Sequence, residues 1–252
     1  MRVLRVMYQD KVFHGALEDQ TVRCLNTSLG IKDPVPLSEV QVLPVVMPTK
    51  VVCVGLNYHG HAREMGKEVP SEPLLFLKPP SAVIGTGEAI VCPAQSRDVH
   101  FEGELAVVMG KVCRKVKVAD VPDHVFGFTC ANDVTARDLQ TRDVQYTRAK
   151  SFDTFCPVGP WIETGVDDPG NLTLRTKVNQ EVRQEESTRD LIVSPYELVS
   201  YVSGIMTLMP GDIVLTGTPS GVGTLHPGDE VHVEIEKIGI LMNRAIAEQE
   251  TG

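Results

Sequence analysis

The segment best suited to chemistry places two carboxylates at the start of an apolar run. Glu102 and Glu104 lie two residues apart, beside His100, and residues 105–109 are all apolar. On a strand, residues two apart share one face, so both carboxylates are expected to point the same way. They then repel each other unless a positive group lies there or one stays protonated. A bound cation resolves the repulsion, whereas two solvated carboxylates on an exposed strand are the commoner meaning of a bare Glu-x-Glu.

A third carboxylate, Asp133, follows the largely apolar stretch 127–131 and is expected to enter the same core. Three carboxylates without a Cys or His partner suit a hard cation such as Mg²⁺ or Mn²⁺, with water or substrate completing the coordination shell. Taken alone, Asp133 is better interpreted as the N-cap of a helix predicted across residues 135–145.

A glycine-rich loop, residues 216–223, follows an apolar strand predicted at 212–215. Its backbone N–H groups could bind an anion. It contains neither the Gly-Lys-Ser/Thr of a Walker A loop nor the GxGxxG of a dinucleotide-binding loop. On its own, a tight turn in a β-protein is the simpler explanation.

Two more segments carry ionisable groups. His61 and Glu64 lie three residues apart on a helix that Asn57 could cap, which is a general-base arrangement unless the two form only a surface pair. Glycines in and around this helix predict that residues 58–70 move over a ligand. Lys150 lies among aromatic residues and could be a partly buried cation, although most lysines are on the surface.

These residues depend on a frame made mainly of strands. Alternating or continuous apolar patterns predict strands near residues 50–55, 74–78, 89–92, 101–109, 125–131, 172–179, 181–187 and 231–238. Ser194 followed by Pro195 predicts the start of an amphipathic helix. Regular β-α-β alternation is absent from the pattern, which argues against Rossmann and TIM-barrel architectures. Four prolines before Thr49 predict a small N-terminal β-rich domain, residues 1–48, ahead of a catalytic domain, residues 49–252.

The composition narrows the class of protein. The 252 residues are 42% hydrophobic with a net charge of −9, which excludes a disordered chain and argues against general nucleic-acid binding. No apolar stretch approaches the roughly 18 residues of a membrane helix, and the N-terminus lacks the apolar segment of a signal peptide. The six cysteines form no CxxC pair, so reduced thiols and a cytoplasmic location are expected.

Taken together, the motifs resemble the fumarylacetoacetate hydrolase (FAH) family. They occur in the family's order over about residues 50–223 and read VGLNYHGHAREM, PLLFLKP, HFEGELAVVMG, GFTCANDVTARDLQ, AKSFDTFCPVGPW, KVNQEVRQ and GDIVLTGTPSGVG. The similarity is to the short branch, which includes acylpyruvases, oxaloacetate decarboxylases and tautomerases, and the isomerase/decarboxylases of homoprotocatechuate breakdown. The larger N-terminal domain and additional carboxylate ligand of the long branch have no counterpart here, so fumarylacetoacetate itself is not the expected substrate.

The resemblance implies a mixed, mainly β fold with a rolled β-barrel and few helices, as a homodimer. It implies that Glu102, Glu104 and Asp133 bind Mg²⁺ or Mn²⁺. The matching positions imply that His61 and Glu64 activate water and that Lys150 acts in catalysis. The substrate pocket is implied to contain the residues Arg137, Gln140 and Thr218.

The implied function is a divalent-metal-dependent enzyme that acts on small anionic 2-oxo or enol acids through a metal-stabilised enolate. From that enolate, water attack would hydrolyse an acylpyruvate, and loss of a β-carboxylate would decarboxylate an oxaloacetate-like acid. The alternative within the enzyme class is an isomerase or tautomerase of 2-hydroxy-diene-dioates or oxaloacetate, without C–C cleavage. The alternative from another class is an inactive metal-binding relative.

Overall fold

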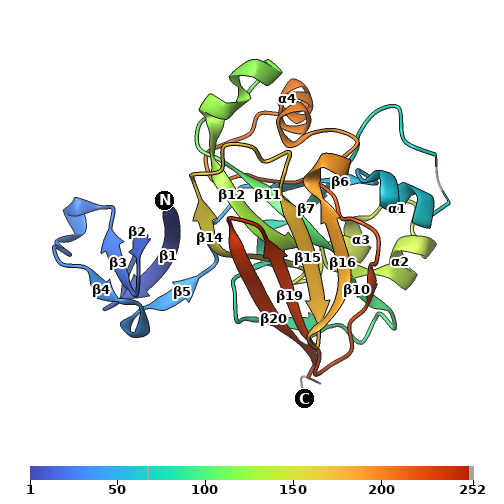
Figure 1. The fold of residues 1–252 in the computed structure, drawn as a ribbon. Coiled ribbons are helices and arrows are strands. Elements are labelled where there is room, and N and C mark those ends of the chain that lie inside the picture. The colour runs from blue at the N-terminus through green and yellow to red at the C-terminus, as the bar shows by residue number, and fades with distance from the viewer. Residues whose placement is uncertain (67, 250–252) are drawn as a thin grey trace.

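Strands dominate the structure, a computed structural model that describes residues 1–66 and 68–249 (Figure 1). The largest sheet has twelve strands, ten of them in the order β4 (Val35–Pro36), β3 (Thr21–Cys24), β2 (Lys11–Glu18), β1 (Arg2–Tyr8), β14 (Cys156–Glu163), β12 (Val125–Asn132), β11 (Gly103–Met109), β17 (Ile213–Leu215), β6 (Val51–Gly55) and β7 (Leu74–Lys78). Strand β5 (Gln41–Leu43) pairs with β1, and β8 (Val83–Ile84) pairs with β14.

Two smaller sheets complete the framework. One contains β16 (Glu181–Ser187), β15 (Thr173–Val178), β19 (Glu230–Ile235), β20 (Gly239–Ala247) and β9 (Ala89–Cys92) in that order, and the other contains β13 (Thr135–Ala136), β10 (Val99–Phe101) and β18 (Gly223–Thr224). The helices are α1 (His59–Glu64), α2 (Arg137–Arg142), α3 (Thr147–Lys150) and α4 (Pro195–Ile205), with 3₁₀ turns at Thr27–Leu29, Leu37–Glu39, Pro80–Ala82, Val118–His124 and Thr188–Asp190. The predicted mainly β architecture with few helices is confirmed.

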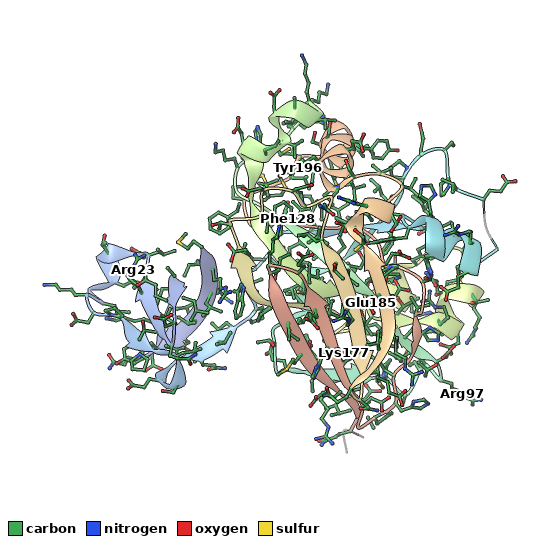
Figure 2. The ribbon with its side chains drawn as sticks, viewed as in Figure 1. Arg23, Arg97, Phe128, Lys177, Glu185 and Tyr196 are labelled. Carbon is green, nitrogen blue, oxygen red and sulfur yellow. The ribbon has the colours of Figure 1, made fainter. Side chains whose placement is uncertain are left out.

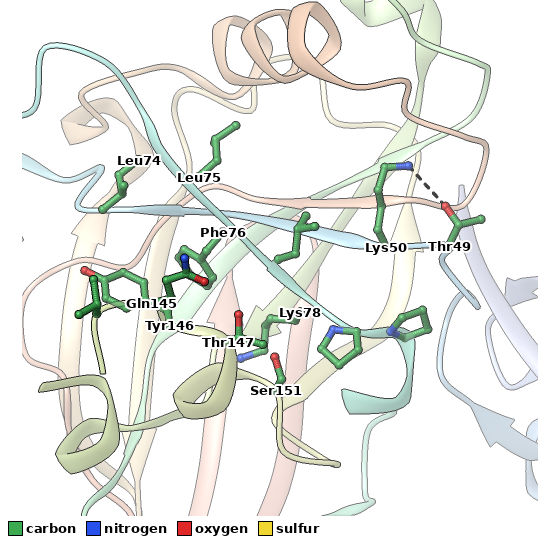
Figure 3. A pocket seen from close by; sticks show the side chains of 14 residues that line it. Thr49, Lys50, Leu74, Leu75, Phe76, Lys78, Gln145, Tyr146, Thr147 and Ser151 are labelled. Atoms are coloured by element: carbon green, nitrogen blue, oxygen red, sulfur yellow. Dashed lines mark hydrogen bonds between the residues drawn. The ribbon is translucent and has the colours of Figure 1, made fainter. Parts of the chain in front are cut away.

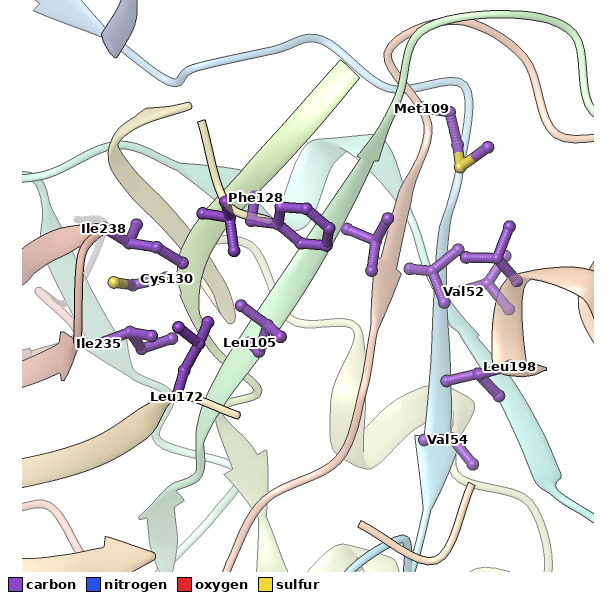
Figure 4. Packing of buried hydrophobic residues seen from close by; sticks show 14 of the residues in the cluster. Val52, Val54, Leu105, Met109, Phe128, Cys130, Leu172, Leu198, Ile235 and Ile238 are labelled. Carbon is purple, nitrogen blue, oxygen red and sulfur yellow. The ribbon is translucent and has the colours of Figure 1, made fainter. Parts of the chain in front are cut away.

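Strand β11 is buried along its whole length because packed side chains cover both of its faces. Leu105 and Val107 belong to the cluster that lies between the two large sheets and beneath α4, together with Phe128 (Figure 4). Ala106 and Val108 belong to a second cluster on the opposite face. The sequence of a strand that is covered on both faces is a continuous apolar run and does not alternate between apolar and polar residues. The carboxylates at its start are therefore brought into the interior.

The first five strands enclose a small apolar cluster of their own, formed by Leu4, Val6, Phe13 and Val22. Figure 1 shows this unit set to one side of the larger body, with α1, α2 and α3 grouped on the opposite side. These strands belong to the twelve-stranded sheet and join its other strands through the pairing of β1 with β14, where Val3 lies opposite Ile162. The division of the chain at residue 48 stays a prediction.

Helix α4 begins as its sequence predicts. The Ser194 side chain accepts the backbone N–H of Glu197, and the Glu197 side chain accepts the backbone N–H of Ser194, which completes a capping box. Tyr196, in the first turn, packs against Phe128 with ring centroids 6.4 Å apart (Figure 2). The cap and this contact fix α4 across one end of the sheets.

Two predictions for the other helices are wrong. Asn57 does not cap α1, because its side chain instead bonds the backbone of Val193 and Thr216, linking three distant segments. The single helix expected across residues 135–145 is divided, because β13 pairs with β10 before α2 begins. In both places a contact far along the chain overrides a local signal.

All six cysteines are free thiols, and four of them are buried. Across residues 1–66 and 68–249, none of the helices has the length and apolar character that crossing a membrane requires.

Asp212 connects the starts of two neighbouring parallel strands, β6 and β17. Its Oδ1 accepts the backbone N–H groups of Thr49 and Lys50 and the Thr49 hydroxyl, at 2.9, 3.2 and 2.7 Å. Its Oδ2 accepts the Met209 N–H at 2.8 Å and the Lys50 ammonium at 2.5 Å. Burial alone would raise the pKa of this carboxyl, but the hydrogen bonds from Lys50, Met209 and Thr49 outweigh it and hold the pKa below its ordinary value.

We expect Asp212→Asn to lower the free energy of unfolding at pH 7 by about 2–4 kcal/mol, because donors that meet a buried carboxylate would face an amide. A carboxyl with a depressed folded-state pKa stabilises the protein above its unfolded pKa and loses that contribution as the pH falls. The difference between wild type and variant should therefore shrink below the ordinary value of 3.8. Urea unfolding at pH 7 and in that acid range measures it. An equal difference at both pH values would contradict the role of the charge.

Candidate active site

Three buried carboxylates meet where β11 begins and β12 ends. The antiparallel register places Gly103 opposite Asn132, and the Asp133 N–H donates to the Glu102 carbonyl at 2.8 Å. One oxygen each from Glu102, Glu104 and Asp133 lies within 4.8 Å of the other two. Their exposed fractions are 5%, 1% and 1%, which excludes the solvated alternative for all three.

The local geometry differs from the one continuous strand predicted at 101–109. The chain leaves β10 at Phe101 and enters β11 at Gly103, so Glu102 occupies a break between strands. Both glutamates still turn toward Asp133. His100 does not join them, because its Nε2 contacts Asp98 at 2.9 Å. Nor does Asp133 cap a helix, since its carboxylate contacts buried lysines.

Two lysines and an arginine surround two of the carboxylates. Lys150 Nζ donates to Glu102 Oε2 at 2.9 Å and to Asp133 Oδ2 at 2.6 Å, and Arg137 pairs with Glu102. Burial would raise the pKa of Glu102, but Lys150 and Arg137 outweigh it and lower that pKa. Burial would likewise lower the pKa of Lys150, but Asp133 and Glu102 outweigh it and raise that pKa. Lys150 is 2% exposed, so it is a buried cation rather than a surface lysine.

Lys78 is one of two site residues that sequence analysis missed. Its Nζ donates to Asp133 Oδ1 at 2.5 Å and to the Val134 carbonyl at 2.9 Å, and the residue is 1% exposed. The available signal was a lysine that ends the apolar strand 74–78, where most positions carry Leu or Phe. A charged residue in such a run is either at an exposed edge or paired inside.

Glu104 stands apart because none of the ion pairs in residues 1–66 and 68–249 includes it. Its Oε2 accepts the Gly217 N–H at 2.6 Å. Burial raises its pKa well above the ordinary range, and the nearby charges of Asp133 and Glu102 raise it further. A carboxyl in this position needs a proton or a cation. The three-oxygen donor set, with one carboxylate lacking a cation, therefore fits a hard divalent ion.

The predicted His–Glu pair is present on α1. His61 Nδ1 lies 2.9 Å from Glu64 Oε2, while Glu64 Oε1 accepts the Gly221 N–H at 3.0 Å. Gly221 has a φ of +94°, and a Cβ there would lie 2.0 Å from the Arg183 carbonyl, so only glycine fits. The glycine-rich loop thus orients the carboxylate, which orients the imidazole. The motion of residues 58–70 stays a prediction, and residue 67 lies outside the described residues.

A chamber of about 430 Å³ brings the predicted residues together. It is lined by His61, Glu102, Glu104, Arg137, Gln140, Lys150 and Thr218. Of the other two predicted residues, Glu64 contacts His61 and Asp133 contacts Lys150. Arg137 also donates to the Gln140 side-chain oxygen at 2.5 Å, so these two present one polar surface.

The Thr218 hydroxyl is already engaged within the protein. It donates to the Gly103 carbonyl at 2.9 Å and accepts from Gln184 Nε2 at 2.8 Å. Gln184 is 1% exposed and also accepts the Gly103 N–H at 3.0 Å. Sequence analysis did not single out Gln184. It ties the glycine-rich loop to the break between β10 and β11, where the carboxylates meet.

Comparisons with known proteins show what this chain is similar to. Residues 50–246 match the family model described as fumarylacetoacetate (FAA) hydrolase C-terminal. The chain is 45% identical to the mitochondrial oxaloacetate tautomerase FAHD2A of Bos taurus over 90% of this chain and 77% of that protein.

Two solved structures share the fold along almost the whole chain. One is a 5-carboxymethyl-2-hydroxymuconate delta-isomerase from Mycobacterium smegmatis, with a TM-score of 0.90 and 41% identity over 99% of this chain and 100% of that one. The other is a maleylpyruvate hydrolase from Sphingobium sp. SYK-6 in complex with manganese(II) and pyruvate, with a TM-score of 0.84 and 32% identity over the same shares.

Proposed function

This chain belongs to the fumarylacetoacetate hydrolase family, and we propose that it is a divalent-metal-dependent enzyme for small 2-oxo or enol carboxylic acids. The proposed reaction is C–C hydrolysis of acylpyruvates or decarboxylation of oxaloacetate-like acids through an enolate. The observation that carries it is Glu104, a buried carboxyl without a cationic partner among the described residues, in one chamber with Lys150 and His61.

We assign Glu102, Glu104 and Asp133 as the residues that would hold Mg²⁺ or Mn²⁺. A divalent cation there would supply a Lewis acid for negative charge that develops on a substrate oxygen. The manganese and pyruvate in the similar maleylpyruvate hydrolase support this assignment. Lys78 keeps Asp133 oriented, because the Val134 carbonyl anchors its ammonium independently of the carboxylates.

We propose different roles toward the substrate for the remaining residues of the chamber. Arg137, Gln140 and the loop at Thr218 would bind and orient the carboxylate of the 2-oxo acid. The Lys150 ammonium contacts carboxylates and the Phe76 ring, so it could turn to the substrate. There it would stabilise the negative charge of the enolate or, after giving its own proton to solvent, accept the C3 proton as a neutral amine. His61, oriented by Glu64, would take a proton from the attacking water.

An isomerase or tautomerase is the second candidate. Enolate formation would rest on the divalent ion and Lys150 without His61, and the similar proteins named oxaloacetate tautomerase and delta-isomerase favour this outcome. An inactive relative is disfavoured because the chain keeps Lys150 and His61 in one chamber with Glu102 and Glu104, and Glu64 contacts His61.

One assay separates these outcomes. Purified protein with Mg²⁺ or Mn²⁺ is incubated with acetylpyruvate, oxaloacetate or a 2-hydroxy-diene-dioate, and both cleavage products and tautomers are followed. Pyruvate and acetate from acetylpyruvate support hydrolysis, and CO₂ from oxaloacetate supports decarboxylation. A change in tautomer without cleavage supports the second candidate. No turnover of any of the three would contradict the proposed function.

We also expect a homodimer. The family resemblance carries this prediction. Light scattering at micromolar concentration should give about twice the chain mass of 27.6 kDa. A mass near that of one chain would contradict it.

A further inference from the structure

We infer that the substrate's end remote from its 2-oxo acid head is an uncharged apolar chain, held in a groove beside the chamber; this inference rests on the proposed function. The groove has a volume of about 760 Å³ and lies along β7, the last strand of its sheet (Figure 3). We call it the β7 groove, and its apolar lining includes Leu75, Leu77, Pro79, Pro80 and Val144.

The β7 groove adjoins the chamber. Leu74, Phe76 and Tyr146 line both spaces. The Phe76 and Tyr146 rings meet edge to face with centroids 5.7 Å apart, and Lys150 Nζ lies 4.9 Å from the Phe76 ring centroid. A substrate whose head contacts Lys150 would reach the groove by passing this aromatic pair.

Charge separates the two spaces. In the chamber, Arg137 and Lys150 pair with carboxylates that would hold the divalent ion, so both would become available to an anionic head when that ion is bound. The β7 groove contains two cations, and both are engaged: Lys50 pairs with Asp212 and Lys78 with Asp133. The groove's lining includes no other Lys, Arg or His within the described part of the chain. A second carboxylate at the remote end would find no free cationic partner there.

Exposed apolar side chains favour the binding of a hydrocarbon chain in the groove, because both surfaces would then be removed from water. Leu77 is 47% exposed and Val144 is 99% exposed, and both line the groove. Burial of each methylene group of a substrate tail here would strengthen binding about 3- to 4-fold.

The test measures binding without turnover. Mn²⁺-loaded protein is titrated calorimetrically with pyruvate, 2-oxohexanoate, 2-oxooctanoate and 2-oxoadipate. We expect the affinity to rise about 3-fold per methylene that reaches the groove, so that 2-oxooctanoate binds at least about 10-fold more tightly than pyruvate. 2-Oxoadipate, which carries a remote carboxylate, should bind at least about 10-fold more weakly than 2-oxohexanoate.

Variants locate the effect. Leu77→Asp should remove most of the gain of 2-oxooctanoate over pyruvate, and Val144→Asp, in an exposed loop where folding is not at risk, should do the same. The control is Val182→Asp, because Val182 is 49% exposed on β16, the edge strand of the five-stranded sheet. It should leave the series unchanged.

The outcomes distinguish this inference from the proposed function. If pyruvate binds but the series is flat, or 2-oxoadipate binds best, or both groove variants keep the wild-type gain, the apolar tail is wrong and the proposed function stands. A flat series with loss of the dimer in Leu77→Asp would assign the groove to a second copy of the chain. If pyruvate itself does not bind in the presence of Mn²⁺, both proposals fail.

Discussion

Replacing Glu104 by Gln is expected to weaken Mn²⁺ binding by at least about 100-fold. This loss of affinity is larger than the one expected when only a residue that hydrogen-bonds a metal ligand is changed. The variant keeps the side-chain size and an oxygen for the Gly217 N–H, but it loses the one carboxylate of the three that has no cationic partner in the described structure. Activity that depends on the metal should fall with the binding.

The same variant is expected to fold at least as well as wild type without metal. Burial, Asp133 and Glu102 all raise the pKa of Glu104, so its charge is unfavourable in the protein without a cation. A neutral amide removes that repulsion. Thermal unfolding should therefore show an equal or higher midpoint without Mn²⁺ and a much smaller upward shift when Mn²⁺ is added.

Calorimetric Mn²⁺ titration of the two proteins measures the effect. Glu185→Gln is the matched control, because Glu185 is an exposed glutamate on the outer strand β16, paired with Arg175 (Figure 2). It should bind Mn²⁺ as wild type does. Wild-type affinity in the Glu104 variant would sink the assignment of the three carboxylates.

The second large effect concerns His61. If the enzyme hydrolyses acylpyruvates, His61→Ala should slow C–C cleavage about 10²- to 10⁴-fold, the usual contribution of a general base. Mn²⁺ affinity should hardly change, because His61 is not among the three carboxylates that we assign to the metal. Exchange of the C3 proton with solvent should persist, because we assign it to Lys150.

Cleavage and deuterium exchange at C3 are measured on the same samples. His59→Ala is the matched control, since it makes the same substitution at an exposed position of the same helix. Full hydrolytic activity in His61→Ala would remove His61 from the mechanism. Equal loss of exchange and cleavage would make His61 the proton-transfer base and favour the tautomerase.

Much of the frame could be predicted from local patterns. Alternation identified β15, β16 and β19, the continuous apolar run identified β11, and Ser194 followed by Pro195 identified the start of α4. These signals depend on neighbours within a few residues, where backbone geometry fixes which side chains share a face. The residue types of the site were also visible, but the residues alone left each of them with a commoner explanation. The ordered set of motifs decided between these explanations through family resemblance.

Other features depended on the tertiary structure. Lys78 reaches Asp133 across 55 positions of sequence, and Asn57 bonds Thr216 across 159, so neither partner was readable from spacing. Strand β13 replaced a predicted helical turn because β10 supplied its pairing. The β7 groove is also a tertiary feature, because it forms between β7 and α3 with the loop that precedes α3. The residue types determine which chemical groups are available, and the local hydrophobic periodicity determines which face of a strand or helix each side chain occupies. The tertiary structure decides which distant group becomes the partner of each carboxylate. Because β11 is buried on both faces, a carboxylate at its start needs a counter-charge or a hydrogen-bond donor, and the fold determines which residue supplies it.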